Sequence, residues 1–219
     1  MIHKSAERPD HLEQMTDEQI SNVLGALALH ISDRLRQTVD IAAEHGSTAP
    51  SAIVVIAQYP GESIEFLSRI LNLSHSATVR LVDRLIDSGL VSKGPASDAR
   101  AVALTCTSSG AKRARSILRA RQKVLQPLVS VLSDVDKRHL EVILRKLPWT
   151  GVQSREAAIH TCRLCDYDRC DLKGNCPVTI ARLLASSPDD TAASNIRQNG
   201  YDPADPDASS TPRNRLRKH

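Results

Sequence analysis

The sequence predicts a mainly helical α+β domain with a long helix near each end. Apolar residues recur at helical spacing over most of residues 16–148, whereas alternation of inward and outward side chains is confined to the short stretch 101–106. Of the 219 residues, 41% are hydrophobic but only 2% are aromatic. The core must therefore be built from Leu, Ile, Val and Ala, which suits helix-on-helix packing.

The first predicted helix begins at Thr16, because Thr16 and Gln19 have the spacing of a capping box. Its apolar stripe continues to about Ala43 and is long for a small domain, so it calls for a partner from a second subunit. Residues 1–15 show no periodicity and are predicted to be a flexible N-terminus. The nearly all-apolar stretch 49–58 is interpreted as a buried helix.

The centre of the chain predicts a compact unit of two helices and a hairpin. Residues 63–88 have the pattern of two short helices joined by a tight turn, and residues 90–107 have that of a short β-hairpin. In its second strand, alternation places Val102, Leu104 and Cys106 on one face. Cys106 is therefore predicted to be a small apolar core residue.

The C-terminal half predicts two more helices and then irregular chain. A long helix opens at Gly110, and Pro127 should kink or interrupt it because proline lacks the N–H donor. Ser133 restarts a helix. Residues 149–160 are predicted to be a linker, and residues 186–219, rich in Asp, Ser, Ala and Pro, a disordered tail.

Positive charge is concentrated in the middle of the chain. The formal net charge is only +4, but residues 61–125 contain 11 Lys and Arg against 5 Asp and Glu, whereas residues 1–60 contain 4 against 8. A phosphate-facing surface is expected on the basic stretch. A solvated helix face accounts for part of the excess, especially along Lys112–Lys123.

Several classes of function are disfavoured. The scarcity of aromatic residues argues against a stacking platform for single-stranded nucleic acid. No apolar run approaches the roughly 20 residues that span a bilayer, and the N-terminus lacks the apolar region of a signal peptide. We therefore expect a cytoplasmic protein without a membrane partner. No phosphate loop, carboxylate pair or activated nucleophile indicates an enzyme.

The helix-turn-helix and hairpin pattern predicts contact with duplex DNA, because the second helix of such a unit enters the major groove. The candidate DNA-contacting side chains on this helix are polar or cationic: Ser74, His75, Ser76, Thr78, Arg80 and Arg84. Arg80 can bind guanine bidentately, and Arg84, one turn further on, is expected to meet phosphate. At the hairpin tip, Asp98 can hold Arg100 for insertion into the minor groove.

Several stretches carry a resemblance to one family. The run Leu71–Leu85 fits a recognition helix without a gap, Gly89–Val91 fits the turn into a wing, and Asp98–Arg100 fits a wing signature. Cys106–Gly110 stands where the pattern usually has Leu-Thr-x-x-Gly, and Leu132-Ser133-Asp134 matches the start of the last helix. Residues 16–148 thus resemble a MarR-family (multiple antibiotic resistance regulator) transcription factor.

The resemblance implies a winged helix-turn-helix homodimer in which the first and last helices interlock. Each lobe would read half of a pseudo-palindromic double-stranded operator, most simply as a repressor. Family members often bind small phenolic or lipophilic ligands between the dimer helices and the DNA lobes, so an effector in the dimer cleft is also implied. Ala99 departs from the family pattern, because a second basic residue is common there, and this weakens the expected wing contact.

The segment 161–185 contains four further cysteines that the family does not need: Cys162, Cys165, Cys170 and Cys176. In a cytoplasmic protein, clustered cysteines are more often metal ligands than disulfides, and four thiolates can complete a tetrahedral site. Zn²⁺ is slightly favoured. The unequal spacing and the terminal Cys-Pro also fit an iron–sulfur cluster, and a metal-free thiol switch is the third alternative. His160 is interpreted as a bystander.

The sequence thus predicts a dimeric transcriptional regulator that a metal or redox site in the cysteine segment modulates. The alternative is an iron–sulfur or thiol redox protein that uses the winged helix only as a dimer scaffold. That alternative leaves the polar recognition positions without a purpose.

Overall fold

The computed structural model describes residues 14–43, 48–95, 102–147, 149, 151–170 and 176–185. In chain order the elements are α1 (Asp17–Ala43), α2 (Ala49–Gln58), α3 (Ile64–Leu71), α4 (His75–Asp87), β1 (Val91–Pro95), β2 (Val102–Cys106), α5 (Ser108–Ser130), α6 (Asp134–Lys146), α7 (Arg155–Thr161) and α8 (Pro177–Ala185). Of the predicted flexible N-terminus, residues 1–15, the first 13 lie outside this part of the chain, as does the predicted tail from residue 186.

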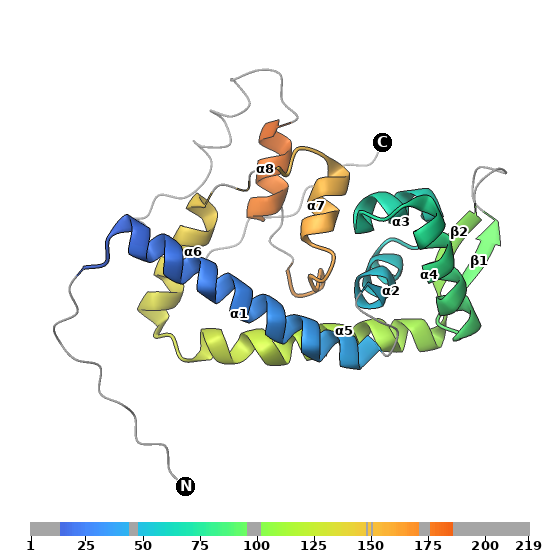
Figure 1. Ribbon diagram of the computed structural model, residues 1–219, viewed down its shortest axis with the longest axis horizontal. Coiled ribbons are helices and arrows are strands. Elements are labelled where there is room, and N and C mark those ends of the chain that lie inside the picture. The colour runs from blue at the N-terminus through green and yellow to red at the C-terminus, as the bar shows by residue number, and fades with distance from the viewer. Residues whose placement is uncertain are drawn as a thin grey trace, which may run out of the picture.

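The long helices α1 and α5 pack along one another and form the spine of the molecule (Figure 1). The sheet, α3 and α4 lie at one end of this spine, and α6 lies at the other. The predicted capping box of α1 is confirmed: Thr16 N–H donates to Gln19 Oε1 at 2.8 Å, and Gln19 N–H donates to Thr16 Oγ1 at 3.3 Å. Both groups satisfy backbone donors that a helix N-terminus leaves unpaired.

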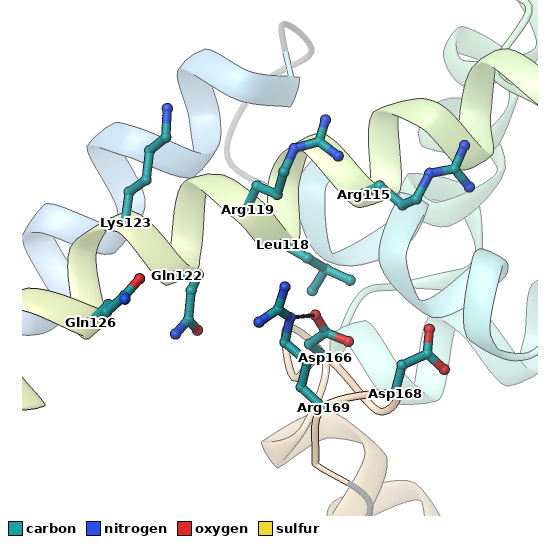
Figure 2. Close-up of a pocket in the computed structure, with 9 residues that line it drawn as sticks. All are labelled: Arg115, Leu118, Arg119, Gln122, Lys123, Gln126, Asp166, Asp168 and Arg169. Atoms are coloured by element: carbon teal, nitrogen blue, oxygen red, sulfur yellow. Dashed lines mark ion pairs between the residues drawn. The ribbon is translucent and has the colours of Figure 1, made fainter.

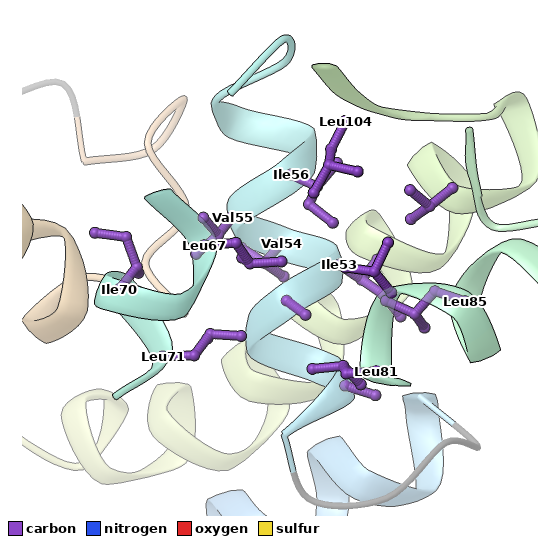
Figure 3. Close-up of a cluster of buried hydrophobic side chains, with 14 of the residues drawn as sticks. Ile53, Val54, Val55, Ile56, Leu67, Ile70, Leu71, Leu81, Leu85 and Leu104 are labelled. Carbon is purple, nitrogen blue, oxygen red and sulfur yellow. The ribbon is translucent and has the colours of Figure 1, made fainter. Parts of the chain in front are cut away.

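Helix α2 runs through the middle of the core, as predicted. Ile53 and Val54 have no exposed surface. Figure 3 shows the side chains of α3, α4 and β2 that surround α2, which include Leu67, Ile70, Leu71, Leu81, Leu85 and Leu104. A helix that is apolar on all sides is stable only when neighbours cover it completely, and this burial makes α2 the centre of the domain.

The hairpin forms with β1 antiparallel to β2, and Val91 pairs with Cys106. The predicted alternation in β2 is partly wrong. Leu104 is buried and Cys106 is half-buried against the core, as expected, but Val102 is 41% exposed and Ala103 is buried. Val102 pairs with the exposed Pro95 at the outer end of the hairpin, where the strand has left the core.

Two features of the C-terminal half differ from the predictions. Helix α5 starts at Ser108, capped by Thr107, and Pro127 lies inside it without ending it. Because Pro127 is in the last turn, it removes one backbone hydrogen bond only, and the helix continues to Ser130. Residues 149–160, predicted to be a linker, contain most of α7, whose Ile159 is buried. The predicted helix start at Ser133 is confirmed by a capping box.

None of the helices in the described ranges combines the length and the apolar composition that crossing a membrane requires.

Candidate nucleic-acid interface and cysteine cluster

The helix-turn-helix is built by local caps on both of its helices. Ser63 Oγ accepts the N–H of Phe66 at 3.1 Å and starts α3, and Ser74 Oγ accepts the N–H of Ala77 at 3.3 Å and starts α4. Asn72 ends α3 in the left-handed region, with φ 56° and ψ 42°, which asparagine tolerates better than most residues. The turn between the helices is therefore specified by short-range chemistry.

Helix α4 separates an apolar face from a polar one. Its buried residues pack on α2 and α3, whereas Ser74, Ser76, Arg80 and Arg84 are exposed. Arg80 and Arg84 lie four residues apart and so share one face of the helix. This exposed row of hydroxyls and guanidinium groups has the chemistry that contacts phosphates and base edges in a major groove.

Thr78 does not belong to this exposed row, and its prediction as a DNA-contacting residue is wrong. The side chain has no exposed surface, and its Oγ1 donates to the carbonyl oxygen of Ser74 at 3.0 Å. The residue lies one turn before Leu81 and Val82, on the apolar face of α4. The spacing of three and four residues from Thr78 to Leu81 and Val82 is the sequence signal that it faces the core.

His75 is exposed and is held by an acidic neighbour from α3. Its Nδ1 lies 3.4 Å from Glu65 Oε2, and the two side chains are 65% and 60% exposed. An exposed pair of this kind contributes little to stability. Because Glu65 adds negative charge beside the N-terminus of α4, it also opposes the approach of phosphate on that side.

An ion pair attaches the wing to α4, and neither of its residues was among the predicted DNA-contacting residues. Lys93 Nζ of β1 lies 2.9 Å from Asp83 Oδ1 of α4. Gly89, with φ 68°, makes the turn between these elements, and its N–H donates to Ile86 O at 2.8 Å. The only sequence signal for Lys93 is that it is a basic residue within the predicted hairpin. Asp98 and Arg100 lie outside the described residues.

The four cysteines of the C-terminal segment lie between α7 and α8. Cys162 is the C-cap of α7, and the N–H of Cys165 donates to its carbonyl oxygen at 2.7 Å. Cys170 closes a turn that starts at Asp166. Cys176 directly precedes α8.

The thiols of this segment influence one another. A hydrogen bond with Cys162 lowers the pKa of Cys165 to about 6, and the positive charge of Arg121 also favours its thiolate. The same hydrogen bond, burial and the charge of the other thiols raise the pKa of Cys162. Burial and the charges of Cys165 and Cys176 raise the pKa of Cys170. The thiols are therefore close enough to affect one another's charge, and the hydrogen bond with Cys162 together with Arg121 favours a thiolate at Cys165.

All five cysteines are free. No group of three or more His, Cys, Asp or Glu side chains in the described ranges is already gathered for a metal ion. The four cysteines thus form a loose cluster rather than a closed coordination shell, and the chain between Cys170 and Cys176 lies outside the described part. The donor set itself fits a thiophilic centre, because four thiolates suit zinc or an iron–sulfur cluster. Cys106 stands apart, and burial raises its pKa to about 11.

A groove of about 510 Å³ separates α5 from residues 162–170, which we call the cysteine loop. Figure 2 shows Arg115, Arg119 and Lys123 of α5 along one wall and the Asp166–Arg169 ion pair, 3.2 Å long, on the other. The three α5 cations have no ion-pair partner within the described ranges. Part of the basic excess of residues 61–125 therefore lines this groove.

Known structures share the architecture of the domain. Rv1404 from Mycobacterium tuberculosis matches with a TM-score of 0.54 at 19% identity, over 64% of this chain and 98% of that one. YusO from Bacillus subtilis matches with a TM-score of 0.51 at 18% identity, over 63% and 100%. A point mutant of MepR from Staphylococcus aureus matches with a TM-score of 0.52 at 16% identity, over 57% and 93%. The chain has a MarR-like winged-helix fold.

The MarR-like fold confirms the predicted fold class, a mainly helical α+β winged helix-turn-helix with a long helix towards each end. No protein-family model and no curated protein sequence matches the chain. About a third of the chain lies outside the match to Rv1404. The cysteine segment must therefore be interpreted from its own residues.

Proposed function

We propose that the protein is a homodimeric regulator of transcription that binds double-stranded DNA in a sequence-specific manner and acts as a repressor. The single observation that carries this proposal is the exposed row Ser74, Ser76, Arg80 and Arg84 on a capped α4, beside a wing that carries Lys93. MepR, a mutant of which shares the fold, is described as a transcription regulator of a multidrug efflux pump. The repressor role rests on the family resemblance.

The geometry supports a docking in which α4 lies in the major groove. Its N-terminal residues would face base edges, Arg80 would read a guanine, and Arg84 would meet the phosphate backbone. The ion pair between Lys93 and Asp83 holds the base of the wing against α4, so that its tip can approach the minor groove. A dimer would repeat this contact on a pseudo-palindromic operator.

Dimerisation is supported by a large apolar surface that no described residue covers. α6 has no buried residue. The exposed apolar side chains gather on the N-terminal half of α1, the end of α5 and α6: Ile20, Val23, Leu24, Leu27, Leu128, Val129, Val131, Val135, Ile143, Leu144 and Leu147. Soluble monomers rarely expose contiguous patches of this kind, and a second copy offers the matching surface in a symmetric dimer.

A small-molecule effector remains part of the proposal. A hollow of about 470 Å³ beside α1, α2, α3 and α7 combines apolar side chains, such as Leu35 and Leu71, with the charged side chains of Arg36, Asp40 and Arg163. Such a lining suits a small, mainly apolar molecule that carries a polar group. This hollow adjoins the cysteine segment, which distinguishes it from a cleft made by the dimer helices alone.

The DNA-binding proposal is tested by replacing Arg80 with alanine. We expect the affinity for a duplex that the wild-type protein selects from a random pool to fall about 5- to 150-fold, with the base preference relaxed at one position, because a bidentate contact to guanine is lost. Affinities are compared by fluorescence anisotropy at the same series of salt concentrations for every variant.

Two further variants make this test specific. Arg84→Ala should weaken binding to all sequences alike and reduce the salt dependence by about one phosphate contact. Arg34→Ala, which removes an exposed arginine of α1 outside the helix-turn-helix, should bind like the wild type. If Arg80→Ala retained wild-type affinity and base preference, α4 would not be the recognition helix.

We also propose that Cys162, Cys165, Cys170 and Cys176 hold a thiophilic metal centre, either Zn²⁺ or an iron–sulfur cluster. Protein purified without oxygen should contain about one zinc per chain and be colourless, or contain iron and sulfide and absorb visible light. Cys165→Ser should lose most of the metal, whereas Cys106→Ser should retain it. Folded wild-type protein with neither metal would refute the centre.

A further inference from the structure

Helix α7 joins the cysteine segment to the first helix of the helix-turn-helix. It packs on α3 (Figure 1). Ile159 is 5% exposed and belongs to the same apolar core as Ile70, and His160 Nδ1 lies 2.7 Å from the carbonyl oxygen of Ile70. Cys162 is the next residue after α7. Any change in the position of Cys162 is therefore transmitted directly to the helix that covers α3.

The cysteine loop also contacts the end of α2, where the chain turns toward α3. Gln58 Nε2 donates to the carbonyl oxygen of Cys165 at 2.6 Å. Tyr59 and Tyr167 share a hydrogen bond of 2.8 Å between their hydroxyls, and their rings pack edge to face at 5.8 Å. Gln58 Oε1 is buried without a hydrogen-bond partner in the described ranges, so the contact is incompletely satisfied and sensitive to the shape of the loop.

A third contact involves the start of α3. Arg155 Nη2, on the first turn of α7, lies 3.1 Å from Glu62 Oε1, and its guanidinium carbon lies 5.1 Å and 5.6 Å from the ring centres of Phe66 and Tyr59. Phe66 is buried in α3. The cysteine segment and α7 thus touch both ends of α3 and the turn before it, on the side away from the exposed row of α4.

From these contacts we infer that metal ligation by the four cysteines controls DNA affinity by fixing the docking of α7 and of residues 162–170 on α2 and α3. This inference rests on the proposed DNA-binding function. Ligation restricts the loop that carries Cys162 and Cys165, and both residues are tied to the winged helix through α7 and Gln58. A fixed α3 holds the turn at Asn72 and thereby the entry angle of α4.

The inference has a thermodynamic consequence. If metal binding tightens DNA binding, then DNA must tighten metal binding by the same factor, because coupling between two sites is reciprocal. Couplings of this type commonly change affinity by about 5- to 150-fold. The metal-loaded form is the tighter binder here, because it presents α3 and α4 already ordered.

The test compares wild-type protein with the double variant Gln58→Ala, Tyr59→Phe, which cuts the loop contacts from the winged-helix side and leaves every cysteine in place. Each protein is stripped with a chelator under reducing, oxygen-free conditions and reloaded with Zn²⁺ or, separately, with Fe²⁺ and sulfide. Gln37→Ala, on the exposed surface of α1, is the matched control. Affinity for the selected duplex and amide hydrogen exchange in residues 64–71 are measured in both states.

We expect loaded wild-type protein and the Gln37→Ala control to bind the duplex at least about fivefold more tightly than the stripped forms, with slower exchange in α3. The double variant should keep its metal but show a clearly smaller loaded-to-stripped ratio than the wild type and a smaller change in exchange, because only the contacts of α7 with α3 remain. A wild-type ratio near one with metal bound, or an unchanged ratio in the double variant, would overturn the inference. If no form bound DNA, the proposed function would be wrong. The difference in hydrogen exchange of α3 between loaded and stripped protein would still show whether metal binding is coupled to α3.

Discussion

Replacing Leu27 of α1 with glutamate is expected to convert the protein into a monomer and to weaken its operator binding by about 10²–10⁴-fold. Leu27 is 47% exposed in one protomer and lies in the middle of an apolar stripe with Ile20, Val23 and Leu24. In a dimer this stripe would be buried, and an unpaired carboxylate there would lose its hydration without compensation. A dimer that contacts two half-sites binds DNA more tightly than a monomer on one half-site by about this factor.

The matched control is Leu29→Glu. Leu29 stands on the same helix and is 69% exposed, but two residues of helix rotate it to the side opposite the stripe. This variant should remain dimeric and bind DNA like the wild type. Light scattering after size-exclusion chromatography gives the mass, and anisotropy gives the affinity. A dimeric Leu27→Glu variant would show that the stripe is not the subunit interface.

Local rules predicted the helix starts of this chain well. The capping box of Thr16 and Gln19 and the helix start at Ser133 were predicted from neighbouring residues, and the structure shows the corresponding hydrogen bonds. A cap depends on a few neighbouring residues, so no knowledge of the fold is needed. The prediction for Thr78 was wrong because it relied on the polarity of the side chain and not on its position on the apolar face of α4.

The interactions that distant segments make could not be predicted from the sequence. Helix α7 has seven residues and one buried side chain, Ile159, so it shows no periodic stripe. A helix this short is marginal on its own and forms because it packs on α3. For the same reason the contacts of Gln58 and Tyr59 with the cysteine loop, 107 and 108 residues further along the chain, carried no sequence signal.

The candidate DNA surface was predictable as a type of element and only partly as a set of residues. Arg80 and Arg84 lie on the exposed face as predicted, because helical spacing alone places them together. Lys93 was overlooked, since its role depends on the approach of β1 to Asp83. The wing residues Asp98 and Arg100 remain predictions, as does the metal at the four cysteines.

The close approach of α5 to the backbone of Leu90 requires a glycine at position 110. Gly110 lies in the first turn of α5, where its N–H donates to Thr107 Oγ1 at 3.0 Å. A Cβ atom added there would overlap the backbone carbonyl of Leu90. Leu90 O already accepts the N–H of Thr107 at 3.1 Å, so this carbonyl is held in place between the turn before the wing and the start of α5.

Gly110→Ala is therefore expected to destabilise the protein by about 3 kcal/mol, at the upper end of the usual cost of overpacking, because neither backbone can move alone. The melting temperature should fall by about 6–12 °C for a domain of this size. Gly25→Ala is the matched control, because its new methyl group meets nothing within 4 Å and alanine favours a helix interior by about 0.5–1 kcal/mol. Thermal unfolding followed by circular dichroism separates the two variants. A Gly110→Ala protein as stable as the wild type would mean that the start of the wing at Leu90 and the first turn of α5 are not in close contact.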